Sequence, residues 1–121
     1  MQRGTVAAGD ARTVAAGVEL LRAGGTAVDA AVAAVFAACV AEPPLTGVFG
    51  GGFMSFAGRD GAASLEAFAQ VPGRGLGPAL EQPGLDFHGV DVDFGATVQT
   101  FHIGRGSVAV PRLLPGLLHL H

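Results

Sequence analysis

A cluster of four glycines is the first feature of this 121-residue sequence that could do chemistry: Gly47, Gly50, Gly51 and Gly52. Glycine lets a ligand or another backbone come close, so such a cluster can cradle a phosphate. A phosphate loop, however, opens a helix after a strand or ends in Gly-Lys-Ser/Thr. Here the glycines lead into residues 53–57, which have the composition of a strand, and the chain contains no lysine. We therefore expect a tight structural turn in preference to a phosphate site.

Three carboxylates and an imidazole in one short stretch suggest a metal site. They are Asp86, His88, Asp91 and Asp93. Such side chains bind divalent ions, but this spacing matches no ligand motif. The stretch also contains alternating apolar residues, Val90, Val92 and Phe94. We expect a solvated loop here and no metal.

The single cysteine and the C-terminal histidines are the remaining candidates for a nucleophile or a ligand. Cys39 lies among alanines and valines, which favours a packed thiol. His119 and His121 are two residues apart, so a helix would place them on different faces. We therefore expect no catalytic residue and no cofactor within these residues.

The composition predicts a folded chain of one domain. Half of the residues are hydrophobic, 14% are charged, and the formal net charge is −3. Without a basic patch, a nucleic-acid partner is disfavoured. The first residues lack the apolar core of a signal peptide, which predicts a cytoplasmic protein, or a periplasmic or secreted one if the N-terminus is truncated.

The first predicted helix runs to about Ala23, with Asp10 or Thr13 as its N-cap. Its apolar face recurs at helical spacing, at Val14, Val18 and Leu21. The Gly-Gly pair at residues 24–25 supplies a C-cap. A second helix follows almost at once, so the two helices should form a pair.

The second helix is predicted over residues 27–41, with Thr26 as N-cap and Asp29 completing a variant of the capping box. It is apolar on all faces, which is typical of a helix buried in a core or a membrane. The run is shorter than the roughly 18 residues of a membrane span, and Asp29 lies inside it. We therefore expect a buried core helix and no membrane association. The Glu-Pro-Pro sequence at residues 42–44 ends it.

Several short runs are predicted to be strands. They are residues 5–8, 53–57, 62–68, 97–103 and 107–111. The second and third should form a hairpin around the turn at residues 58–61. A last helical face is predicted from Leu113, Leu117 and Leu120.

Five stretches, in order along nearly the whole chain, resemble the opening of γ-glutamyltransferases, also called glutathione hydrolases. They are residues 4–8 (GTVAA), 16–33 (AGVELLRAGGTAVDAAVA), 42–43 (EP), 46–54 (TGVFGGGFM) and 106–111 (GSVAVP). One such stretch alone is weak, whereas the ordered combination is specific.

The resemblance implies an N-terminal nucleophile hydrolase, an α/β (α+β) fold in which two sheets lie between layers of helices (αββα). It implies a precursor that cleaves itself, after which a newly exposed N-terminal threonine attacks a γ-glutamyl or related acyl amide. In the family this threonine belongs to a small subunit that lies far downstream, and we find no equivalent here. We therefore expect residues 1–121 to form the N-terminal segment of a large subunit, an incomplete sandwich that is inactive alone.

The resemblance also implies the partners: the downstream part of the large subunit, the small subunit with the nucleophile, and a small-molecule substrate. Family members carry an Arg-Glu-x-Ala-Pro pattern whose arginine holds the substrate carboxylate. Phe68 stands at that arginine position here. A phenyl ring cannot make the charge-assisted contacts of an arginine. Either another residue, with Arg74 as the candidate, supplies the charge, or Phe68 binds a more apolar acyl group. Gln70 is a further candidate for contact with the substrate. Packing of Phe68 on the sheet is an equal alternative.

The alternative hypothesis is that the protein is not an enzyme but a non-catalytic scaffold that binds an apolar ligand or a protein. Self-cleavage of the complete gene product would distinguish the enzyme from this module.

Overall fold

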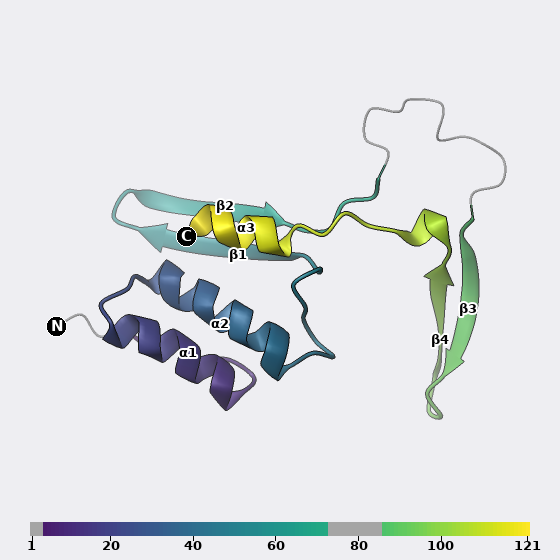
Figure 1. Cartoon of the computed structure of the whole chain (residues 1–121), viewed down its shortest axis with the longest axis horizontal. Coiled ribbons are helices and arrows are strands. Elements are labelled where there is room, and N and C mark those ends of the chain that lie inside the picture. The colour runs from purple at the N-terminus through teal and green to yellow at the C-terminus, as the bar shows by residue number, and fades with distance from the viewer. Residues whose placement is uncertain (1–3, 73–85) are drawn as a thin grey trace. The chain divides into compact units, whose positions relative to one another are not determined.

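The computed structural model describes residues 4–72 and 86–121. The chain divides into two compact units, one formed by Met1–Ala69 with Pro111–His121 and the other by Gln70–Val110. Figure 1 shows the elements of both units along the chain. Among the described helices, none combines the length and the apolar character needed to cross a bilayer.

The first unit begins with helix α1 (Ala11–Arg22), whose predicted N-cap is confirmed at Asp10. The Asp10 carboxylate accepts a hydrogen bond from the Arg12 N–H at 2.8 Å. At the other end Gly24 has a φ of 94°, and the N–H of Gly25 donates to the Leu20 carbonyl at 2.9 Å. The positive φ of Gly24 and the hydrogen bond from Gly25 form the C-terminal cap that the Gly-Gly pair predicts.

Helix α2 (Ala27–Ala41) has the predicted capping box, since Thr26 and Asp29 each bond the other's backbone N–H. It pairs with α1, and Figure 1 shows it between α1 and the β1–β2 hairpin. Gly17 allows the close approach of the two helices, because a Cβ there would lie 3.0 Å from the Ala30 carbonyl oxygen.

The prediction that α2 is buried on every side is wrong for the described residues. Only Ala30, Val32 and Ala34 are buried among the residues of α2, and Val40 is 80% exposed. Ala27 is also exposed, and the other residues of the helix are partly buried in the described unit. The all-apolar helix is therefore only partly covered in the described part of the unit.

Strands β1 (Gly52–Gly58) and β2 (Gly61–Ala67) form the predicted antiparallel hairpin, joined at Arg59 and Asp60. Gly61 adopts a φ of 123°, which a side chain would oppose. Met54 pairs with Leu65 in the register, and both lie on the face that also carries the buried Ala67. This face packs on the helices.

Helix α3 (Leu113–Leu120) completes the first unit and confirms the predicted apolar face. Val32 of α2 meets Leu113 and Leu117 in the core, with Leu120 partly buried beside them. A Cβ at Gly116 would lie 2.5 Å from the Cβ of Ala67, so the helix and β2 are in close contact at this glycine.

The second unit contains a hairpin of β3 (His88–Asp93) and β4 (Val98–Ile103), followed by the short 3₁₀ helix η2 (Arg105–Ser107). β4 confirms the predicted strand. The expectation of a solvated loop around Val90 and Val92 is wrong, because these residues belong to β3. Val90 pairs with Phe101. The alternation of apolar residues in this stretch therefore reflects the two-residue period of a strand, and not a loop.

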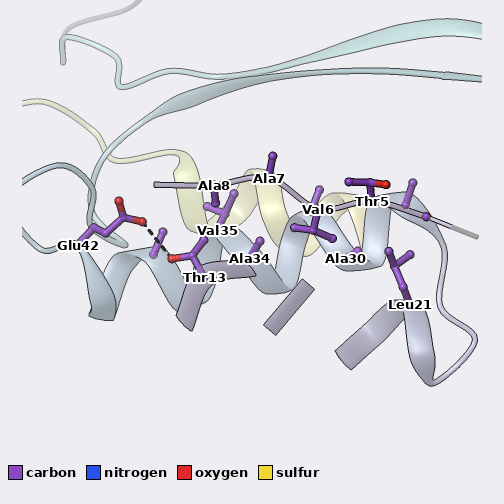
Figure 2. Close-up of a pocket in the computed structure, with 14 residues that line it drawn as sticks. Thr5, Val6, Ala7, Ala8, Thr13, Leu21, Ala30, Ala34, Val35 and Glu42 are labelled. Carbon is purple, nitrogen blue, oxygen red and sulfur yellow. Dashed lines mark hydrogen bonds between the residues drawn. The ribbon is translucent and has the colours of Figure 1, made fainter. Parts of the chain in front are cut away.

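Two other predicted strands are also wrong. Residues 107–111 start in η2, and only Val110 forms an isolated bridge, with Gln70. Pro111 lacks an N–H and cannot extend a ladder. Residues 5–8 run extended over α1 and α2 (Figure 2) but are mostly exposed and pair with no described strand. The extended conformation is therefore present without the partner strand that the prediction required.

Candidate functional site

The carboxylates of the suspected metal site have structural partners in the second unit. Asp86 accepts hydrogen bonds from the N–H of Arg105 at 3.1 Å and from its Nε at 3.3 Å. Asp91 accepts from the Thr100 hydroxyl, and Asp93 accepts from the Gly95 N–H, both at 2.7 Å. In the residues that the structure describes, no group of three or more His, Cys, Asp or Glu side chains is placed to hold a metal ion. These carboxylate oxygens therefore make hydrogen bonds within the β3–β4 hairpin and to the segment that follows it.

Cys39 packs against the core of the first unit and is half-buried. Its Sγ lies 3.8 Å from the Thr46 Oγ1. A thiol among apolar neighbours behaves as a small hydrophobic side chain. The environment is the one expected of a packed thiol.

The glycine cluster forms the junction between β1 and α3. The N–H of Gly50 donates to the Gly47 carbonyl at 2.9 Å. The Gly50 carbonyl in turn accepts the N–H groups of Arg112 and Leu113, at 3.2 and 3.1 Å, at the start of α3. This carbonyl thus satisfies two N–H groups at a helix N-terminus, which are otherwise unpaired.

Gly51 contacts the backbone of the chain that leaves β2. A Cβ at Gly51 would lie 2.8 Å from the Phe68 Cα and closer still to the Ala69 nitrogen. These contacts give the glycines a structural role. No φ between +20° and +160° occurs at residues 47 and 50–52. Close backbone approach, and not a left-handed conformation, is what requires Gly51.

Phe68, the first of the three predicted substrate-binding residues, follows directly after β2. Its ring stacks on that of Phe53, with centroids 5.3 Å apart and an interplanar angle of 18°. Both rings are exposed, Phe53 by 72% and Phe68 by 53%. Phe53 was not predicted from the sequence as a site residue. The signal for it is the hairpin register, which brings the start of β1 beside the end of β2.

Of the other two predicted residues, one belongs to the second unit and one lies outside the described residues. Gln70 belongs to the second unit, where its N–H and carbonyl form the bridge to Val110 at 3.1 and 2.7 Å. Arg74 lies outside the described residues.

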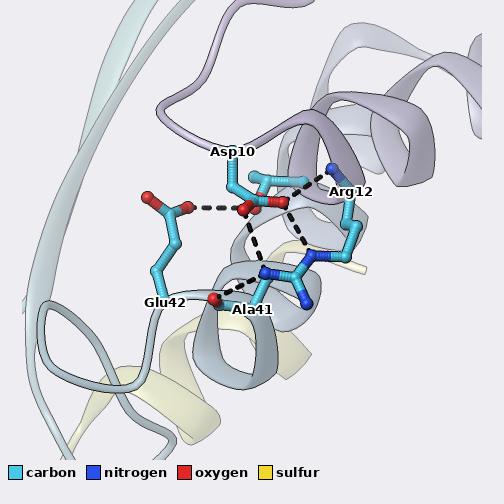
Figure 3. Close-up of polar contacts among 5 residues, drawn as sticks. Asp10, Arg12, Ala41 and Glu42 are labelled. Atoms are coloured by element: carbon cyan, nitrogen blue, oxygen red, sulfur yellow. Dashed lines mark hydrogen bonds and ion pairs between the residues drawn. The ribbon is translucent and has the colours of Figure 1, made fainter.

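A polar cluster joins the start of α1 to the end of α2 (Figure 3). The Arg12 guanidinium donates to both oxygens of Asp10 and to the Ala41 carbonyl at 3.1 Å. The hydrogen bonds from Arg12 lower the pKa of Asp10 to about 2. The buried Thr13 hydroxyl donates to Glu42 at 3.0 Å. The cluster fixes the two helices relative to each other, and its groups are already paired.

An apolar groove of about 600 Å³ runs beside this cluster, between residues 4–8 and α2 (Figure 2). Val6 packs on α1 beside it, because a Cβ at Gly17 would lie 3.0 Å from the Val6 Cγ1. The groove wall on α2 consists largely of alanines, and Glu42 and Thr13 also line it. Among the described residues that line it, the polar side chains are those of Thr5, Thr13 and Glu42.

The chain matches the sequence profile described as gamma-glutamyltranspeptidase over residues 13–121. It is 39% identical over 80 residues to the acylase ACY 1 proenzyme of Pseudomonas sp. (strain SE83), covering 65% of this chain and 14% of the relative. It is 36% identical over 115 residues to the glutathione hydrolase proenzyme of Bacillus subtilis subsp. natto, covering 94% of this chain and 18% of the relative. The chain thus spans less than a fifth of these curated relatives.

Solved structures of similar fold cover the entire chain. The transpeptidase enzyme CapD of Bacillus anthracis matches with a TM-score of 0.68 and 23% identity, over 32% of its own chain. The gamma-glutamyltranspeptidase of Pseudomonas nitroreducens matches with a TM-score of 0.67 and 26% identity, over 33% of its own chain. These matches confirm the fold class, a mixed α and β structure that forms part of the N-terminal nucleophile hydrolase sandwich. Together with the profile match, they show that this chain belongs to the gamma-glutamyltranspeptidase family.

Proposed function

We propose that this chain is the N-terminal segment of the large subunit of an amidohydrolase or acyltransferase that acts on γ-glutamyl or related acyl amides. The single observation that carries the proposal is the profile match, which extends over residues 13–121. The curated relatives are named glutathione hydrolase and acylase proenzymes, which supports an acyl-amide substrate and a precursor.

The proposed chemistry needs a nucleophile from another part of the protein. In the family mechanism an N-terminal threonine forms an acyl-enzyme, its own amine acting as base, and water or an amine then takes the acyl group. The segment supplies helices α1 and α2, the β1–β2 hairpin and the glycine junction to this assembly. Its partners are the remaining large-subunit residues and the small subunit, and alone it is inactive.

Residues near the end of β2 are proposed to contact the substrate: Phe68, with Gln70 and Arg74 as further candidates. Phe68 has the exposure that this role requires, since half of its side chain is accessible in the described unit. Gln70 has its backbone occupied by Val110, so only its side-chain amide is available to a ligand.

The test is expression of the complete gene product, followed by electrophoresis and an assay with γ-glutamyl-p-nitroanilide and other acyl p-nitroanilides. Self-cleavage into two fragments and release of p-nitroaniline are expected. Replacement of the new N-terminal threonine by alanine is the matched control, which should abolish both. A protein that stays uncleaved and turns over no acyl amide would favour the non-catalytic scaffold and overturn the proposal.

A further inference from the structure

Glu42 is the residue at which the chain turns away from α2, and its carboxylate is held by the other helix of the pair. Its backbone is not helical (φ −128°, ψ 53°), and Pro43, which cannot continue a helix, follows it. The Thr13 hydroxyl of α1 donates to Glu42 Oε2 at 3.0 Å (Figure 2), and Thr13 is only 3% exposed. The half-buried Glu42 side chain thus has a fixed partner on α1.

Two more contacts restrict this turn of the chain. A Cβ at Gly9 would lie 2.6 Å from Glu42 Oε1, so the lack of a side chain at Gly9 leaves space for the carboxylate. Arg12 Nη2 donates at 3.1 Å to the carbonyl of Ala41, the residue before Glu42. Two neighbouring residues of α1 therefore hold two neighbouring residues at the end of α2.

Glu42 also closes the first turn of the loop that leads to the glycine junction. Its carbonyl accepts the N–H groups of Leu45 at 2.9 Å and of Thr46 at 3.2 Å. A second turn follows directly, in which the N–H of Gly50 donates to the Gly47 carbonyl at 2.9 Å. The Gly50 carbonyl then receives the first N–H groups of α3. Residues 42–50 therefore form two consecutive hydrogen-bonded turns between the helix pair and the junction.

The glycine junction in turn touches the end of β2. A Cβ at Gly51 would lie 2.8 Å from the Phe68 Cα and closer still to the Ala69 nitrogen, so the two backbones are in contact. A contact between backbones cannot be relieved by rotation of a side chain, and close-packed groups transmit a displacement to their neighbours. A shift of Gly51 toward β2 must therefore move the backbone at Phe68.

We propose that Glu42 is a positioning residue for the substrate site: its carboxylate, anchored on α1, fixes the loop over residues 42–50 and thereby the backbone at Phe68. This inference rests on the proposed function, in which Phe68 contacts the substrate. Glu42 itself touches no substrate and acts through the loop. Its loss should change KM for the acyl donor more than kcat, because it alters a binding contact and no reacting group.

The kinetic test compares two variants of Glu42 in the complete, self-cleaved protein, with the acyl p-nitroanilide that the wild type hydrolyses fastest. Glu42→Ala removes the acceptor and is expected to raise KM roughly 2- to 30-fold with little change in kcat per active site. Glu42→Gln keeps an oxygen that can accept the Thr13 hydroxyl, so its KM should stay close to that of the wild type. Glu19→Ala, at an exposed carboxylate of α1, is the matched control and should change neither constant.

A double-mutant cycle tests whether Glu42 acts through Phe68. Glu42→Ala should raise KM less in a Phe68→Ala background than in the wild type, since the two residues are then coupled. Gly9→Ala is a second variant in case Glu42→Ala does not self-cleave, because it keeps the carboxylate but displaces it, and it should raise KM in the same way. The inference is overturned by a loss of kcat at unchanged KM, or by an equal rise in KM in both backgrounds.

Hydrogen exchange separates failure of this inference from failure of the proposed function. It is measured by NMR on the complete protein, whether or not that protein turns over amides. Glu42→Ala is expected to speed exchange at the N–H groups of Thr46, Gly50 and Leu113 relative to the wild type and to Glu42→Gln, because their hydrogen bonds depend on the fixed loop. Unchanged exchange at all three overturns the inference, whatever the activity. Faster exchange in a protein that turns over no amide supports the coupling and overturns the proposed function alone.

Discussion

Replacing Gly116 by alanine is expected to destabilise the unit that contains α3 by about 1 kcal/mol. Two effects oppose each other at this position. Alanine is favoured over glycine inside a helix by about 1 kcal/mol. The new Cβ, however, would lie 2.5 Å from the Cβ of Ala67 and 3.3 Å from a Leu65 methyl. Overpacking of this kind costs roughly 1–3 kcal/mol, so a middle value of about 2 exceeds the helical gain.

The packing effect should prevail because Ala67 cannot easily move aside. Its Cβ is attached directly to β2, which is paired to β1 along its whole length. A flexible side chain could rotate away, whereas here the strand or the helix must shift. Ala67 is also 5% exposed, so little free space surrounds it. The expected loss therefore depends on the contact between Gly116 and Ala67.

Urea unfolding followed by circular dichroism measures this loss as a change in the free energy of unfolding. Gly58→Ala is the control, because nothing lies within 4 Å of a Cβ there, and it should stay within about 0.5 kcal/mol of the wild type. Ala67→Gly combined with Gly116→Ala should recover at least about 0.5 kcal/mol through their coupling. The reasoning is refuted if Gly116→Ala alone stabilises the protein, since helix propensity would then outweigh the contact.

Three further outcomes are expected. The pKa of Asp10 is lowered from 3.8 to about 2, so its ionised form stabilises the fold above pH ~4, and this stabilisation is lost as the pH falls from about 4 to 2. Asp10→Asn keeps an N-cap but cannot ionise, so its Tm should fall less than that of the wild type over the same pH range. Leu117→Ala, at a side chain 3% exposed, should cost about 2–5 kcal/mol, whereas Leu118→Ala, 61% exposed, should cost less than about 0.5 in the same urea experiment. Thr26→Ala should cost about 1 kcal/mol through the lost cap of α2, and Thr26→Ser should restore most of it; equal unfolding free energies for the two variants would contradict the capping role.

The elements that the sequence predicts well are those that local chemistry determines. The cap at Asp10, the capping box of Thr26 with Asp29 and the left-handed Gly24 each depend on residues within one or two turns. The β1–β2 hairpin likewise depends on a two-residue turn between matching strands. These interactions form wherever the local sequence permits them, so the pattern alone predicts them.

The predictions that failed depend on partners distant in the sequence. Residues 5–8 have the composition of a buried strand, but strand formation also requires a neighbouring strand, and the described residues supply none. The apolar alternation in β3 is a strand signal, but its aspartates and glycine are unfavourable in strands, and pairing with β4 overrides that preference. Within the candidate site, Phe68 could be selected by its position in a motif, whereas Phe53 requires knowledge of the register.

The glycine junction explains why separate motifs of the family belong to one structural unit. Gly50 carries no reactive group, yet its carbonyl receives the first N–H groups of α3. Gly51 presses on the backbone at Phe68, and Leu113 comes within 3.4 Å of a Cβ built at Gly52. Three consecutive residues thus connect the start of β1, the end of β2 and the start of α3. A side chain at Gly51 would displace the backbone at Phe68 and Ala69, so the need for glycine here follows from close backbone packing and not from phosphate chemistry.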